Sequence, residues 1–238
     1  VFARVKSIKS QAEVDICRKS AKIADLAMES ALDMVKPGVT EMQISANAIR
    51  VLMENDASNL LNTHPVFCAS GLLSGRISLL PTNREIQNGD IVSIGIGSNI
   101  GGYQTYVHRT TTAGQPSPQQ RKLLETVLNI QTAVIGVLQR GVVTSDILQV
   151  QKGMLNDSGY AKTYVHPFLG QGLGTDLINL PMLVSGYPGQ DEQLEPNMLL
   201  VVGPTIIADG IGMACFQDSL LIDENTHEDL TKCKKKTW

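Results

Sequence analysis

The amino-acid sequence predicts a single α+β domain, made of two related halves around a strongly curved antiparallel sheet. The stretch VKPGVTEMQISANAIRVL returns as LQRGVVTSDILQVQKGML, so that Gly38 matches Gly141 and Ile44 matches Ile147 at a constant offset of 103 positions. In each half two helical segments precede a run of strand-like segments. No Pro- or Ser-rich linker divides the 238 residues, so we expect one domain over 1–238 with a ligand pocket between its halves.

The first half is predicted to begin with two helices. Apolar residues recur every three or four positions over 13–34, and Lys36-Pro37-Gly38 ends that helix. Thr40, with Gln43 three residues on, is typical of a capping box, which starts a second helix running to about Glu54. The further elements expected in this half are a strand at 65–69, a Gly- and Ser-rich loop at 70–78, a turn at 88–90, and a hairpin over 93–112 that turns at Gly101-Gly102.

The second half repeats this order. A long helix is expected over 117–140, with Pro118 in its first turn, and a shorter one over 145–157. The strands expected after them lie at 163–167, 198–204 and 213–222.

Composition excludes several classes of protein. The net charge of -3 gives no basic footprint, so we expect no nucleic-acid partner. The basic run Lys232–Lys236 is interpreted as a frayed, solvated tail. No apolar run approaches the roughly 18 residues of a membrane span, so no membrane partner is expected. The cysteines form no CxxC pair, and Cys17, Cys68 and Cys215 lie in apolar patterns, which favours buried thiols in a cytoplasmic protein.

Several motifs together resemble the creatinase/aminopeptidase family, which has the pita-bread fold. They are IKSQAEVDICRKSAKIADLAM, PTNREIQNGDIVSIGIGSNIGGY, HRTTTAGQPSPQQRKLLETV, LEPNMLLVVGP and DSLLI, in the order and at the spacing of that family. The style is that of its creatinase and prolidase branch. The resemblance implies that residues 1–238 are a catalytic domain of the C-terminal type, that a separate N-terminal domain is absent from this chain, and that the native assembly is a homodimer.

The peptidases of that family bind two metal ions through two Asp, one His and two Glu. The matching positions in this sequence are Gly95, Tyr106, Gln171, Gly203 and Gln217. All of them lack an ionisable metal ligand, whereas such a site requires carboxylate oxygens and imidazole. We therefore expect no metal and no other cofactor.

Creatinase suggests another chemistry, because it hydrolyses a C–N bond without a metal ion. Its proton-shuttling His matches Ser78 here, and its substrate-holding Glu matches His108. Strand alternation places His108 on the face of Tyr106, toward the expected pocket, so His108 is the candidate catalytic acid or base. The alternative is a buried histidine that orders the strand, and Tyr106 equally fits a residue that fills the space of the lost metal.

The further candidate substrate-binding residues are Ser78, Tyr103, Tyr106, His166, Gln171 and Gln217. Two functions remain open. One is a metal-independent, creatinase-like hydrolase acting on a small polar metabolite with a C–N bond, with a rate limb near pH 6 to 7 from His108. The other is a catalytically inactive pseudo-peptidase that binds a peptide or a protein. Whether the chain is an enzyme is left open by the sequence.

Overall fold

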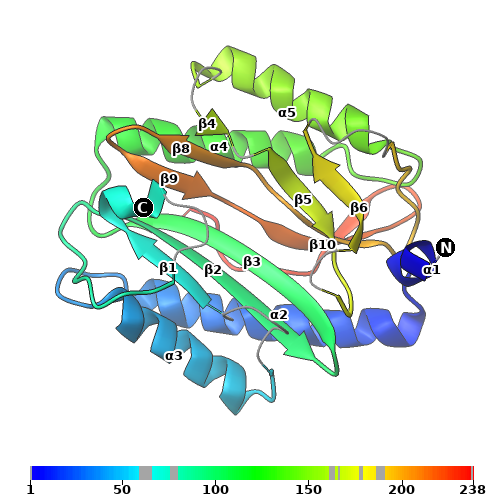
Figure 1. The fold of residues 1–238 in the computed structure, drawn as a ribbon, viewed down its shortest axis with the longest axis horizontal. Helices are drawn as coiled ribbons and strands as arrows, with labels where there is room; N and C mark the ends of the chain where they lie inside the picture. Colours follow the sequence, from blue (N-terminus) through cyan, green and yellow to red (C-terminus); the bar gives the residue numbers. More distant parts are fainter. Residues whose placement is uncertain are drawn as a thin grey trace.

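The structure is a computed structural model that describes residues 2–58, 66–75, 80–160, 164–165, 167–176, 179–185, 191–236 and 238. Its helices lie on the outside and its strands between them. In Figure 1, α2 and α3 run along one side of the strands, and α4 and α5 lie on the opposite side. None of the described helices is long and apolar enough to cross a membrane.

The first half folds as its local signals predict, except that the helix at 2–7 and the 3₁₀ helix at 71–75 were not predicted. Thr40 caps α3 in a complete capping box with Gln43, and the hairpin turns at two glycines with positive φ, Gly101 and Gly102. Its elements are α1 (Phe2–Ser7), α2 (Gln11–Asp33), α3 (Glu41–Glu54), β1 (Val66–Ser70), the 3₁₀ helix η1 (Gly71–Gly75), β2 (Ile91–Ile100) and β3 (Tyr103–Thr112). The strands form an antiparallel sheet in the order β1-β2-β3.

The internal duplication is confirmed by two equivalent pairs of backbone hydrogen bonds, one in each half. Gly38 N donates to Ile86 O (3.0 Å), and Ile86 N donates to Val39 O (2.9 Å). In the second half Gly141 N donates to Leu194 O, and Leu194 N donates to Val142 O, both at 2.8 Å. Gly38 and Gly141 have φ of 86° and 85°, a conformation that favours glycine, so the two matched glycines serve the same turn.

The second half differs from the prediction in several boundaries. The helix expected over 117–140 ends at Ile135, because Gly136 is its C-cap and the next turns use three-residue hydrogen bonds. Strands at 168–172, 179–184 and 227–229 were not predicted. The elements are α4 (Pro118–Ile135), α5 (Thr144–Ser158), β4 (Tyr164–Val165), β5 (Phe168–Gly172), β6 (Asn179–Val184), β7 (Leu199–Val202), β8 (Thr205–Ala208), β9 (Gly212–Cys215), β10 (Asp218–Ile222) and β11 (His227–Asp229).

The two strands expected at 198–204 and 213–222 form a hairpin that is bent, and each is divided into two shorter strands at the bend. The strand predicted over 198–204 stops at Val202 and resumes as β8, since Gly203-Pro204 interrupts the ladder and proline has no N–H to donate. The partner predicted over 213–222 breaks opposite, between β9 and β10. One sheet therefore has the order β11-β10-β7-β5-β6 and another the order β4-β8-β9.

The two halves meet where this hairpin bends. His108 of β3 and Gln217, just before β10, form an antiparallel bridge, with N–O distances of 3.0 and 3.1 Å. Each half has its own apolar core, and a third cluster lies between α2, β7 and β10. All four cysteines are buried and carry free thiols, which confirms the burial predicted for Cys17, Cys68 and Cys215.

Candidate functional site

The face of the β2–β3 hairpin that looks toward the second half carries the candidate site. In the ladder Gly95 lies opposite His108, and Gly97 lies opposite Tyr106. Side chains alternate along a strand, so Tyr106 and His108 emerge on one face, as the sequence predicts. Their contact bears this out, because Tyr106 Oη lies 3.1 Å from His108 Nδ1.

Tyr106 occupies the space that a side chain at position 95 would need. A Cβ atom built on Gly95 would overlap Tyr106 Oη, and it would lie 2.9 Å from His108 Nδ1. Both positions correspond to carboxylate ligands in the family's peptidases. The phenol of Tyr106 thus occupies the space in which a metal ligand at position 95 would lie. This agrees with the interpretation of Tyr106 as a space-filling residue.

The opposite wall is closed by backbone. A Cβ atom on Gly203 would overlap the carbonyl oxygen of Phe216 and lie 2.9 Å from the Cα of Gln217. The Gln217 side chain donates from Nε2 to Gly203 O at 3.2 Å. Gly203 therefore leaves no room for a ligating side chain, and the amide of Gln217 is already used within the protein.

These residues do not fit a pair of catalytic metal ions. The nearest polar groups are a phenol, an imidazole and neutral amides, whereas two such ions require several carboxylates. Within the described ranges, no three or more His, Cys, Asp or Glu side chains gather in a way that could hold a metal ion. No chemical step is therefore assigned to metal ions in this domain.

His108 stands in the middle of a directional hydrogen-bond chain. Thr110 Oγ1 donates to Cys215 O (3.1 Å) and accepts from Cys215 N (3.0 Å), so its hydrogen is committed. When both contacts of Ser93 Oγ are taken as hydrogen bonds, it donates to Thr110 Oγ1 (3.3 Å) and accepts from His108 Nε2 (2.8 Å). His108 Nδ1 is left to accept from the Tyr106 phenol, which is satisfied only by a neutral imidazole.

Burial disfavours the charged form of this imidazole. His108 is 8 % exposed. Burial, assisted by the nearby Arg109 guanidinium, lowers the pKa of His108 from 6.5 to about 3. Burial also raises the pKa of the Tyr106 phenol well above its usual range, so the phenol keeps its proton. The rate limb that the sequence suggested near pH 6 to 7 is therefore not expected from His108 in this environment.

Acidification is expected to destabilise the protein through His108. Its pKa is about 3 in the folded state and 6.5 when unperturbed, so between these values the unfolded chain binds more protons. The free energy of unfolding should rise with pH through this window and level off above it. From pH 6.5 to 5 the loss should be between about 1 and 2 kcal/mol, because the slope at pH 6.5 is half of its full value of about 1.4 kcal/mol per pH unit.

Urea denaturation at several pH values, for the wild type and His108→Gln, measures this effect. The variant cannot titrate at this position and should lose the His108 part of the slope between pH 5 and 6.5. Equal slopes in the two proteins would show that His108 titrates normally in the folded state.

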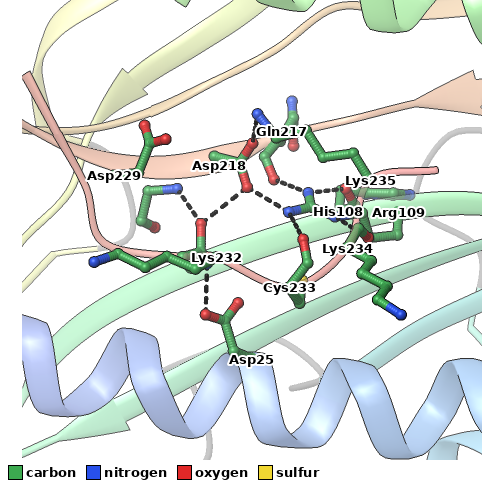
Figure 2. Close-up of polar contacts among 12 residues, drawn as sticks. Asp25, His108, Arg109, Gln217, Asp218, Asp229, Lys232, Cys233, Lys234 and Lys235 are labelled. Carbon is green, nitrogen blue, oxygen red and sulfur yellow. Dashed lines mark hydrogen bonds and ion pairs between the residues drawn. The ribbon is translucent and has the colours of Figure 1, made fainter.

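Arg109, next along β3, anchors the bridge that holds His108 and Gln217. Its Nη1 donates to His108 O (2.8 Å) and Gln217 O (2.9 Å), and its Nη2 donates to Asp218 Oδ1 (2.6 Å). The carbonyls of Cys233 and Lys234 accept its other two hydrogen bonds, so all five donors are satisfied (Figure 2). A fully satisfied buried guanidinium fixes the backbone of the candidate site.

The same network corrects the expectation for the C-terminal run Lys232–Lys236, which is not a frayed tail. Lys232 N donates to Asp25 Oδ2 at 2.5 Å, and Lys235 Nζ pairs with Asp218 Oδ2 at 2.9 Å. Figure 2 shows this segment lying across Arg109 and Asp218. The sequence pattern showed only a charged run, whereas the backbone carbonyls of that run supply acceptors to a buried arginine.

The structure brings some of the predicted residues together and leaves others apart. Tyr103 lies outside the hydrogen-bond chain, because its hydroxyl donates to Glu13 Oε1 of α2 at 2.7 Å. Gln171 is buried in β5, opposite Val201 of β7. Ser78 and His166 lie outside the described residues. The substrate-binding roles of all these residues stay predictions.

Sequence reasoning missed Ser93, Thr110 and the backbone of Cys215. A signal for the first two exists, because the Gly101-Gly102 turn fixes the register that places Ser93 opposite Thr110 on the face of His108. Cys215 comes from the other half of the chain. Its contact depends on how the bent hairpin packs, for which the sequence gives no local signal.

The family model for metallopeptidase family M24 matches residues 15–224. The chain belongs to this family. The solved prolidase from Pyrococcus furiosus superposes with a TM-score of 0.92 at 25% identity, covering 98% of this chain and 68% of the other. The Xaa-Pro dipeptidase from Bacillus anthracis gives 0.90 at 26% identity, covering 99% and 64%. These matches confirm the pita-bread fold and the creatinase/aminopeptidase resemblance.

The curated relatives of this M24 domain include hydrolases. It is 27% identical to the Xaa-Pro dipeptidase of Pyrococcus furiosus, over 99% of this chain and 66% of that protein. It is 28% identical to the uncharacterized peptidase YqhT of Bacillus subtilis, over 98% of this chain and 64% of that protein. The chain thus spans about two thirds of the length of these relatives.

Proposed function

We propose that this M24 domain is a pseudo-peptidase, which binds a peptide or a protein without a catalytic metal pair and without cleaving it. The observation that carries this proposal is the Tyr106 phenol, which takes the room of a ligand side chain at position 95. Restoring a metal ligand there requires Tyr106 to move, and Tyr106 is held by its hydrogen bond to His108. At position 203 the carbonyl oxygen of Phe216 closes the corresponding space.

A peptide is the ligand class that the family relation favours. Several relatives are named as Xaa-Pro dipeptidases, and the present domain keeps their fold over nearly its whole length. Loss of the metal ligands abolishes metal-dependent catalysis, but the fold and the arrangement of its two halves are kept. We therefore propose that this domain binds the same class of ligand as its relatives, a peptide, but does not catalyse their reaction.

A metal-free hydrolase is the second candidate, because one observation favours it. His108 Nε2 lies 2.8 Å from Ser93 Oγ, the separation of a base and a nucleophile. Against it, the assigned hydrogen-bond directions place the proton on Nε2, where the imidazole donates to Ser93 instead of accepting its proton. Ser93 is also only 2 % exposed. The pseudo-peptidase is therefore the better supported function.

Turnover assays separate the two functions. Xaa-Pro dipeptides should be hydrolysed no faster by the protein with Mn²⁺ or Co²⁺ than by the metal salt alone. A panel of small amide and amidino metabolites, followed by mass spectrometry, should likewise remain unchanged. Metal-dependent cleavage of the dipeptides would contradict the proposal. Metal-independent turnover that falls by about 100-fold in His108→Gln, the usual contribution of a general acid or base, would establish the hydrolase instead.

A further inference from the structure

Lys9, between α1 and α2, is a buried cation that forms no salt bridge with any carboxylate among the described residues. Its side chain is 2 % exposed, and its Nζ donates to one acceptor, Ser7 O, at 2.9 Å. No other hydrogen bond or ion pair of this ammonium is made within the part of the chain that the structure describes. Two of its three donors are therefore unused, which is costly for a charged group removed from water.

The space beside Gly174 lies next to this ammonium. A Cβ atom built on Gly174 would have as its nearest neighbours Lys9 Cε at 3.5 Å, Asn179 Nδ2 at 3.6 Å and Lys9 Nζ at 3.6 Å. These are ordinary van der Waals distances, so Lys9 Nζ and Asn179 Nδ2 both lie beside the side of Gly174 that carries no side chain. Asn179 is 7 % exposed, and its Nδ2 uses one hydrogen toward Asp176 O, which leaves its second hydrogen available.

Gln104 adds a third unsatisfied donor to this region. Its backbone N donates to Gly174 O at 3.0 Å, which ties the start of β3 to the end of β5. Its side chain is 1 % exposed, and Nε2 has no hydrogen-bond partner. Buried amide hydrogens are rarely left unpaired in folded proteins. Lys9 Nζ, Asn179 Nδ2 and Gln104 Nε2, on three residues that contact Gly174, thus all carry hydrogens that no described acceptor takes.

The charge of this group of residues selects the chemistry of its partner. Burial lowers the pKa of Lys9 to about 8, although Cys17 and Glu13 act against this shift. Lys9 is thus still largely protonated at pH 7. An ammonium beside unused amide hydrogens favours an anionic ligand, and amide hydrogens can donate to the oxygen of a carboxylate.

We propose that Lys9, Asn179 and Gln104 form a niche beside Gly174 that takes a carboxylate oxygen of a ligand. The niche follows directly on β5, the strand that carries Gln171, so it adjoins the candidate site. The carboxylate belongs either to the C-terminus of a peptide, which rests on the proposed function, or to a small organic acid. Both sources share the chemistry that the niche recognises.

Thermal melting of the full chain at pH 7 tests the niche. The probes are sodium acetate, N-acetyl-alanyl-proline and the C-terminal amide of that peptide, each compared with sodium chloride at equal ionic strength. Carboxylate binding should raise Tm by roughly 2 °C or more once the probe is well above its Kd. A shift with the peptide acid alone assigns the niche to peptide termini, and a shift with acetate as well assigns it to small acids.

Two variants and one control connect the shift to these residues. Lys9→Gln removes the charge and should abolish the Tm shift. Asn179→Asp places a fixed carboxylate beside Lys9 and should also abolish it, which provides a second test if Lys9→Gln does not fold. Lys19→Gln makes the same charge change on the exposed face of α2 and should keep the shift.

Three results would overturn the niche: no shift with any carboxylate, an equal shift with chloride or the peptide amide, or a shift that survives in Lys9→Gln. Metal content and turnover of the same preparation are measured separately. A failed niche with no metal and no turnover leaves the pseudo-peptidase intact. Metal-dependent turnover would refute the pseudo-peptidase whatever the Tm shows.

Discussion

Gly203→Ala is expected to lower the free energy of unfolding by at least about 3 kcal/mol, at the upper end of what single substitutions do. The added Cβ would overlap the carbonyl oxygen of Phe216, and it would meet the Cα of Gln217 at 2.9 Å. Both are backbone atoms, which cannot move aside as the end of a flexible side chain can. Relief requires opening the bent hairpin where it joins the two halves. Urea denaturation, monitored by circular dichroism, measures the loss.

Gly153→Ala is the matched control. Gly153 lies in α5, and a Cβ built on it meets nothing within 4 Å. The same substitution there should stabilise the protein by roughly 0.5–1 kcal/mol, because alanine is the better helix former. If Gly203→Ala behaves like Gly153→Ala, the space at position 203 is open and the hairpin does not close the site.

Local signals predicted the first half well because its elements depend on neighbours in sequence. The Thr40 capping box starts α3 at Glu41, and the glycine pair at 101–102 sets the β2–β3 hairpin with its register. The repeat of Gly38 at Gly141 predicted the duplication, since both turns require positive φ. In each case the residue type and the conformation are linked by one short-range physical cause.

The second half was predicted less well because its boundaries depend on tertiary packing. The apolar spacing of α4 continues to Leu138, which is buried, yet the helix ends at Ile135. The Gly203-Pro204 pair indicates the end of a strand from the sequence alone. The break opposite it, between β9 and β10, has no such local sequence signal. The Lys232–Lys236 run has the composition of a solvated tail, and only Arg109 reveals it as a set of carbonyl acceptors.

At the candidate site, the sequence predicted which ligands are missing but could not show how their space is filled. Motif positions 95 and 203 carry glycine, and glycine alone is compatible with an open pocket. The structure shows instead that Tyr106 and the Phe216 carbonyl occupy these places. Likewise, the ordinary pKa of histidine suggested a proton-transfer role for His108, whereas burial lowers that pKa to about 3.

Metal stoichiometry tests the central claim most directly. The protein is incubated with excess Mn²⁺, Co²⁺ or Zn²⁺, exchanged into metal-free buffer, and measured by elemental analysis. A site without carboxylate ligands should retain less than about 0.1 equivalent of any of them per chain. Retention of about two equivalents, the number that a dinuclear hydrolase holds, would show that Tyr106 moves aside and that this domain is a metallopeptidase after all.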